Sequence, residues 1–76
     1  MKDKELNERI GYEMRTQRLI HRMTLAQMAD RMGLKSRNSV SIMELGKTQI
    51  TVSDLKAFCD VLNVDYLDIL KKVGGE

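Results

Sequence analysis

Apolar residues recur at intervals of three or four positions along most of the chain, with polar and charged residues between them. This spacing gathers apolar side chains on one face of an α-helix, and the chain contains no proline that would interrupt a helix. The pattern predicts a first helix from about Lys4 to about His21. Its apolar face is expected to hold Leu6, Ile10, Met14 and Leu19.

A short second helix is predicted to follow Thr24, whose hydroxyl suits the N-cap position. Gly33 is expected to end this helix in the left-handed backbone conformation that glycine adopts at low cost. The apolar stripe between these two residues consists of Leu25, Met28, Ala29 and Met32.

Two further helices are indicated by their caps. Ser36 can cap a third helix that runs to Leu45 and ends at the following glycine. Thr51, with an aspartate three residues later, is typical of a capping box, and it opens a fourth helix over "VSDLKAFCDVL". Asn63 is expected to close that helix, because asparagine tolerates the left-handed conformation better than most residues.

The last helix is predicted from Tyr66 to about Val73, where Asp65 and the aspartate three residues later repeat the capping pattern. Residues 74–76 are expected to form a frayed tail. The sequence therefore predicts an all-α fold of five short helices with tight connections, in one domain over residues 1–76.

The composition indicates the cellular compartment. The chain has 76 residues and one cysteine, so it has no internal disulfide, which fits a reducing compartment. The charged N-terminal segment "MKDKELNER" lacks the apolar run of a signal peptide, and no stretch approaches the ~20 apolar residues of a membrane span. We expect a cytoplasmic protein without a membrane partner.

The net charge of +2 is small, but the charges are unevenly distributed. Residues 15–48 carry +5, whereas residues 1–14 carry −1 and residues 49–76 carry −2. A basic middle with mildly acidic flanks is typical of a nucleic-acid-binding surface. An ordinary solvated face is the alternative interpretation.

The third predicted helix has two unlike faces. Val40 and Met43 share one side and can pack inward, because successive helical residues are ~100° apart. The other side carries side-chain types that can hydrogen-bond base edges or contact a thymine methyl, together with a further leucine: Arg37, Asn38, Ser41, Ile42 and Leu45. These residues predict a helix that reads the DNA major groove, with Arg37, Asn38, Ser41 and Ile42 in contact with bases. A surface helix without such a role is the alternative.

The segment "TLAQMADRMGLKSRNSVSIMELGK" resembles the helix-turn-helix of the lambdoid phage repressor and Cro-type family, also called the XRE family. Ala29 occupies the small-residue position where two helices touch, and Gly33 lies four residues later at the turn. "IGYEMRTQR" is similar to the first-helix pattern of the family, and "LKAFCDVLNVDYLDIL" is similar to its last two helices. The resemblance implies a lambda-repressor-like DNA-binding domain, with the helix-turn-helix at about residues 24–46.

The resemblance also implies roles for individual residues. Arg18 and Glu44 match a pair that commonly forms a partly buried salt bridge between the first helix and the recognition helix. Lys47, Thr48 and the N-terminal end of the second helix match positions that usually contact phosphates. We therefore expect the DNA backbone to be contacted by Thr24, Lys35, Ser36, Ser39, Lys47 and Thr48.

Three departures from the family pattern concern the site. The turn before Arg37 is one residue longer than usual, with Lys35 or Ser36 as the extra residue. Leu25 stands where many members carry a glutamine that braces a phosphate, and Ile42 stands where members often place a polar side chain.

No other chemistry is indicated. His21 is the only histidine and Cys59 the only cysteine, and they do not supply the four ligands of a typical zinc site. Cys59 lies among apolar residues and is interpreted as a core residue. The chain has no phosphate-binding glycine loop, so we expect neither catalysis nor a metal or cofactor.

The predicted function is that of a transcriptional regulator that binds double-stranded DNA at a two-fold-symmetric operator. A repressor is the favoured interpretation, and an activator is the alternative. A module this small reads few base pairs, so we expect a homodimer. The apolar face of the last helix either forms the dimer surface or completes the core; the residues concerned are Tyr66, Leu67, Ile69 and Val73. A phage-type repressor, an antitoxin and a restriction-modification controller all fit this description.

A second hypothesis is a helical module of the same fold that binds a regulatory protein partner and does not read DNA, as an antitoxin or anti-repressor partner would. Ile42 and Leu45 on the outward face, and Leu25 in place of a polar residue, favour it.

Overall fold

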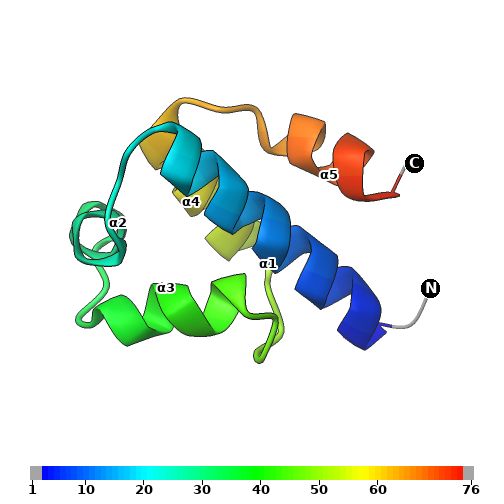
Figure 1. The fold of residues 1–76 in the computed structure, drawn as a ribbon, viewed down its shortest axis with the longest axis horizontal. Helices are drawn as coiled ribbons and strands as arrows, with labels where there is room; N and C mark the ends of the chain where they lie inside the picture. Colours follow the sequence, from blue (N-terminus) through cyan, green and yellow to red (C-terminus); the bar gives the residue numbers. More distant parts are fainter. Residues whose placement is uncertain (1–2, 75–76) are drawn as a thin grey trace.

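The computed structural model describes residues 3–74, which form five α-helices. Their bounds are α1 Asp3–Ile20, α2 Leu25–Met32, α3 Arg37–Glu44, α4 Val52–Leu62 and α5 Tyr66–Gly74 (Figure 1). The all-α fold and all five helices are as predicted, and the starts of α2 to α5 agree with the sequence prediction to the residue.

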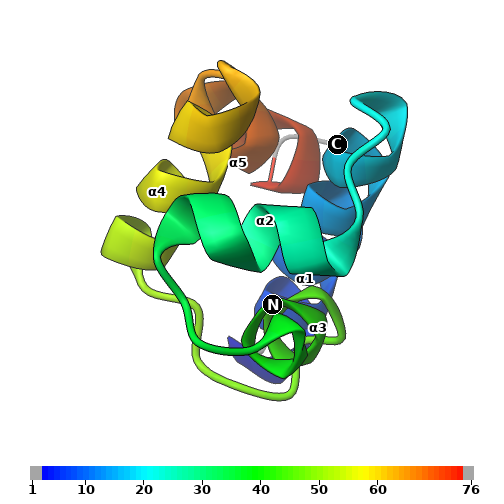
Figure 2. The same cartoon turned by 90° about the vertical axis from the view of Figure 1, so that its left-hand side faces the viewer.

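The long helix α1 packs against α3, α4 and α5, while α2 packs against α3 and α4. Figure 1 shows α1 running diagonally across the molecule in front of α4, and Figures 1 and 2 both place α3 and α5 at opposite ends. The helix α3 therefore has its neighbours on one side only, and its other side faces outward. None of the helices over residues 3–74 is long and apolar enough to cross a bilayer.

The predicted N-caps are present. Thr24 accepts a hydrogen bond from the Gln27 backbone N–H, and the Gln27 side chain accepts one from the Thr24 backbone N–H, so α2 opens with a full capping box. The Ser36, Thr51 and Asp65 side chains each accept one hydrogen bond from a backbone N–H in the first turn of their helices. These bonds satisfy donors that helix geometry leaves unpaired.

The helix ends follow the predicted glycine and asparagine positions, with two differences. Gly33 and Asn63 adopt left-handed φ values of 77° and 59°. The helix α3 ends at Glu44, with Leu45 as its C-cap. Gly74 is the last residue of α5, so the prediction that it belongs to a frayed tail is wrong, and residues 75–76 lie outside the described residues.

The core contains buried side chains from every helix. Met14, Met28, Val40 and Phe58 are fully buried, and Cys59 is 1% exposed. The prediction for α1 is correct for Ile10 and Met14, but Leu6 and Leu19 are exposed. Leu19 faces solvent because Arg18, four residues after Met14, occupies the inward position of that turn.

Gly11 sets the distance between α1 and α3. A Cβ atom on this buried residue would lie 2.4 Å from the Met43 carbonyl oxygen and 2.6 Å from that of Glu44. The C-terminal turn of α3 therefore rests directly on the backbone of α1. Only glycine permits this approach, because neither side of the contact is a flexible side chain.

The predicted salt bridge between Arg18 and Glu44 joins the same two helices. Arg18 Nε donates to Glu44 Oε2 at 2.7 Å, and Arg18 Nη2 donates to Glu44 Oε1 at 3.0 Å. Arg18 Nη1 also donates to the Met23 carbonyl oxygen at 2.7 Å, which ties the connection between α1 and α2 to the pair. Both side chains are more than 90% buried, and this fork-to-fork geometry gives the pair directional specificity.

We expect Gly11→Ala to lower the free energy of unfolding by about 1–3 kcal/mol, because the overlap with two carbonyl groups outweighs the better helix propensity of alanine. Urea denaturation monitored by circular dichroism measures the change. Gly74→Ala is the matched control, because nothing lies within 4 Å of the Cβ position there. Equal stability of the two variants would contradict the close contact.

We expect Glu44→Ala to cost about 3–5 kcal/mol, because it leaves the Arg18 guanidinium buried without its counter-ion. Lys72→Ala breaks the exposed pair with Glu13 and should cost less than about 1 kcal/mol. The double variant Arg18→Met/Glu44→Leu should recover much of the loss in the same urea assay, because it removes both buried charges. A double variant as unstable as Glu44→Ala would show that the apolar packing of the site, rather than the unpaired charge, sets the cost.

Candidate nucleic-acid interface

The helix α3 divides into a buried and an exposed face. Val40 is fully buried and Met43 is 5% exposed, so this face is part of the core. Arg37, Asn38 and Ile42 are exposed on the other face, as the sequence predicts. Ser41 is half-buried and lies at the edge between the two faces, so less of its hydroxyl is accessible than the sequence suggested.

The connection between α2 and α3 fixes the orientation of the outward face. The Leu34 backbone N–H donates to the Ala29 carbonyl at 2.8 Å, which closes the end of α2. The side chain of Leu34 packs partly buried against the core, whereas Lys35 and Ser36 are exposed. In the longer turn, Leu34 packs inward, whereas Lys35 and Ser36 face solvent. Ser36 is also the N-cap of α3.

The six residues expected to contact phosphates are all exposed: Thr24, Lys35, Ser36, Ser39, Lys47 and Thr48. Thr24 and Ser36 use their hydroxyl oxygens to accept capping hydrogen bonds. A hydroxyl has one hydrogen to donate besides its acceptor lone pairs, so both side chains keep a donor for a phosphate oxygen. Capping and phosphate binding are therefore compatible at these positions.

A shallow hollow lies between α3, the loop that follows it and the start of α4. Its lining combines apolar and polar residues of these elements and of the turn before α3: Leu34, Ser39, Ile42, Met43, Thr48 and Asp54. The hollow joins Thr48 to the exposed face of α3, so residues on both sides of the C-terminus of α3 share one surface. Asp54 adds a single carboxylate there, which opposes the attraction of the basic residues for a phosphate.

The basic residues of the middle segment do not all lie on the surface, although the net charge of +5 is unchanged because Arg18 and Glu44 are buried as a pair. Arg18 is one of the basic residues of the middle segment, but it is buried and its charge is neutralised by Glu44. Lys35, Arg37 and Lys47 are exposed around α3 and carry the positive charge of this surface. The sequence alone counts all basic residues equally, whereas the fold removes one of them from the interface.

Sequence reasoning missed Asn7, a half-buried residue of α1. Its side chain donates to the Thr48 carbonyl at 3.1 Å and accepts from the Ile50 backbone N–H at 3.4 Å. No motif signals this contact, because more than 40 residues separate the partners.

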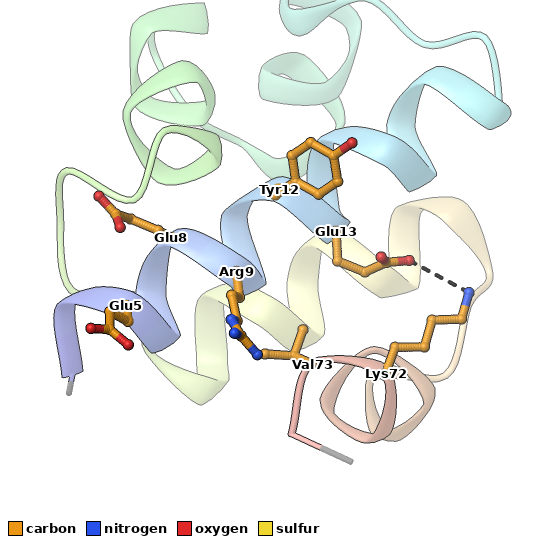
Figure 3. A pocket seen from close by; sticks show the side chains of 7 residues that line it. All are labelled: Glu5, Glu8, Arg9, Tyr12, Glu13, Lys72 and Val73. Carbon is orange, nitrogen blue, oxygen red and sulfur yellow. Dashed lines mark hydrogen bonds and ion pairs between the residues drawn. The ribbon is translucent and has the colours of Figure 1, made fainter. Parts of the chain in front are cut away.

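A groove between α1 and α5 is lined mainly by charged side chains, and its residues do not form a recognisable metal or catalytic site. Figure 3 shows its charged lining on α1 and the ion pair between Glu13 and Lys72, whose Oε2 and Nζ atoms are 3.5 Å apart. Among residues 3–74, no three histidine, cysteine or acidic side chains are grouped to hold a metal ion. Burial raises the pKa of the Cys59 thiol to about 11, with smaller contributions from Asp60 and Asp65, so Cys59 is protonated at neutral pH and is no nucleophile.

The predicted dimer surface on α5 needs correction. Ile69 is 1% exposed and Val73 is 7% exposed, so both belong to the core of the single chain. Both residues lie in the core because α5 packs against α1 and α4. The apolar face that could have formed a dimer surface therefore completes the core of the single chain. Tyr66 is half-buried beside the Lys56 ammonium, which lies 5.7 Å from the ring centroid. Leu67 is the one member of the set that is exposed.

Comparison with known proteins places this geometry in a family. A helix-turn-helix family profile matches residues 14–69, from the middle of α1 into α5. Among solved structures, the chain is similar to the clp gene regulator ClgR from C. glutamicum, with 26% sequence identity and a TM-score of 0.85. That match covers 92% of this chain and 90% of the other. No curated protein sequence matches the chain.

The family profile covers well over half of the sequence and includes both helices whose geometry is described above. The matched residues include α2, the turn and α3. The chain belongs to the XRE-type helix-turn-helix family of DNA-binding domains.

Proposed function

We propose that the protein is a transcriptional repressor that binds a two-fold-symmetric operator as a homodimer and acts by occupying it. The observation that carries this proposal is the exposed row of Arg37, Asn38 and Ile42 on a helix whose opposite face is fixed in the core. The structural similarity to a gene regulator supports a role in transcriptional regulation.

In the proposed complex, α3 lies in the major groove. Arg37 pairs with the acceptor atoms of a guanine edge, and Asn38 pairs with an adenine edge. Ile42, which is 42% exposed, contacts a thymine methyl group, and Ser41 donates to a base from the border of the buried face. The exposed Arg37 and Asn38 side chains can distinguish base pairs by their hydrogen-bonding pattern.

The phosphates on either side are contacted by three groups of residues. Thr24 binds at the N-terminus of α2, where the backbone N–H groups also favour an anion. Lys35, Ser36 and Ser39 bind around the start of α3, and Lys47 and Thr48 bind beyond its end. Contacts at both ends of α3 fix the register of the helix in the groove.

Leu67 is the proposed centre of the dimer contact. Its side chain is 48% exposed on α5, and α5 lies at the end of the molecule opposite α3 (Figures 1 and 2). A contact there leaves the outward face of α3 free in both copies. The buried residues Ile69 and Val73 support this surface from within.

A protein-interaction module remains the second candidate, because Ile42 and Leu45 are 42% and 55% exposed on one outward helix. Neither leucine nor isoleucine reads a hydrogen-bonding pattern, whereas both suit an apolar protein partner. Salt dependence separates the candidates, because binding through phosphates weakens steeply as salt is added.

We expect selection from a random duplex library to enrich a two-fold-symmetric sequence. Arg37→Ala and Asn38→Ala should each weaken binding to it by about 1–3 kcal/mol and relax the preference at one base position, because each removes a base-edge contact. Fluorescence anisotropy titrations at several salt concentrations measure both effects. Arg9→Ala, in the groove between α1 and α5, is the control for loss of one positive charge. Binding that shows no enriched sequence, or variants equal to Arg9→Ala, would contradict base reading by α3.

We expect Leu67→Glu to give a folded monomer, because it places a charge in the proposed dimer contact on an exposed position. Val73→Glu should instead unfold the chain, because it buries a carboxylate that has no partner. Sedimentation equilibrium and circular dichroism distinguish the two results. A Leu67→Glu variant that remains dimeric would place the dimer contact elsewhere.

A further inference from the structure

The side chain of Asn7 joins α1 to the α3–α4 loop, residues 45–51. Its Nδ2 donates to the Thr48 carbonyl oxygen at 3.1 Å, and its Oδ1 accepts from the Ile50 backbone N–H at 3.4 Å. Both ends of the amide are engaged, so the side chain has one orientation. It holds the backbone of the loop at two points.

The same loop is fixed at its ends by contacts of other kinds. Gly46 adopts a left-handed φ of 71°, and a Cβ atom there would lie 2.7 Å from the Glu8 Cα atom. The Lys47 backbone N–H donates to the Ile42 carbonyl at 3.1 Å, and the Ile50 side chain is buried in the core. Between these points, Asn7 makes the side-chain hydrogen bonds that hold the middle of the loop.

Thr48 accepts one of the two Asn7 hydrogen bonds, and Lys47 directly precedes it; both side chains are exposed. Both belong to the phosphate-binding group proposed above. A charged side chain on a flexible loop loses conformational entropy when it binds, whereas one on a loop that is already ordered loses less. The two hydrogen bonds of Asn7 therefore act on the residues that meet the DNA backbone.

We propose that Asn7 is a positioning residue for DNA binding: it touches no DNA itself, and it presents Lys47 and Thr48 to the phosphate backbone by holding the α3–α4 loop against α1. This inference rests on the proposed function, because it assigns Asn7 to the phosphate contacts of that interface. It predicts a loss of affinity that is the same for every DNA sequence, since phosphates carry no sequence information.

The test compares Asn7→Ala, Lys47→Ala and the double variant on two duplexes, one enriched by selection and one with the same bases scrambled. Asn7→Ala should weaken binding to both by a similar factor and lower the magnitude of the slope of log K against log salt by about 0.9, the value for one phosphate contact. Wild-type binding should then fall about 3-fold more than that of Asn7→Ala between 50 and 200 mM salt.

The double variant tests whether the two residues act together. If Asn7 works through Lys47, the double variant binds no more than slightly weaker than Lys47→Ala, so the two losses are not additive. Gln17→Ala is the matched control, because it removes another half-buried amide of α1 whose hydrogen bond stays within the helix. This control should leave both the affinity and the salt slope unchanged.

Two results overturn the inference and are distinguishable from each other. If Lys47→Ala weakens binding and Asn7→Ala leaves the affinity and salt slope at wild-type values, DNA binding stands and the positioning role is wrong. If the folded wild-type protein binds neither duplex at 50 mM salt, the proposed function and the positioning role both fail.

A second variant keeps the test decisive if Asn7→Ala unfolds. Asn7→Asp is isosteric and keeps the acceptor for the Ile50 N–H, but it places an oxygen against the Thr48 carbonyl. Gln17→Glu adds the same charge to the same helix and is its control. The inference requires a larger loss of affinity for Asn7→Asp than for Gln17→Glu, and equal losses overturn it.

Discussion

The contact between α1 and the C-terminal turn of α3 is the constraint on which the outward face of α3 depends. Gly11 allows the Met43 and Glu44 carbonyls to rest on the α1 backbone, and the Arg18–Glu44 pair fixes the rotation of α3 about that point. The backbone contact at Gly11 sets the distance between α1 and α3, and the bidentate Arg18–Glu44 ion pair sets the orientation of α3. Because α3 has only two turns of its own, its orientation comes from these neighbours.

The same arrangement explains how a domain this small can present a polar and charged face on α3 while the opposite face of that helix is in the core. The inward side of α3 contributes Val40 and Met43 to the core, so the polar and charged outward side is carried by residues that the core does not need. Arg18 shows the opposite use of a charge, since the fold buries it and pairs it with Glu44. Basic residues of one segment thus serve two purposes, and burial decides which purpose each one serves.

Most of the helix boundaries were predictable, because each depends on groups a few residues apart. The Thr24 and Thr51 caps bind N–H groups three residues away, and Gly33 and Asn63 end helices through their own φ angles. The prediction for α1 is wrong where helical periodicity alone had to show which side chains another helix covers. Leu19 was assigned to the core although Arg18 holds the inward position, because periodicity gives the direction of a side chain without showing what packs there.

The helices, their caps, the family and the outward residues of α3 can be read from the sequence, because they depend on local hydrogen bonds, on the helical period and on an ordered motif. The packing of α5 against α1 and α4 places Ile69 and Val73 in the core and leaves Leu67 exposed, a distinction that the apolar pattern of α5 does not make. The tertiary structure also brings Asn7 to the loop carrying Lys47 and Thr48, across a separation of 41 residues. Such contacts exist only after the helices pack, since the free energy that forms them comes from burial of the shared core and not from the residues next to them in the chain.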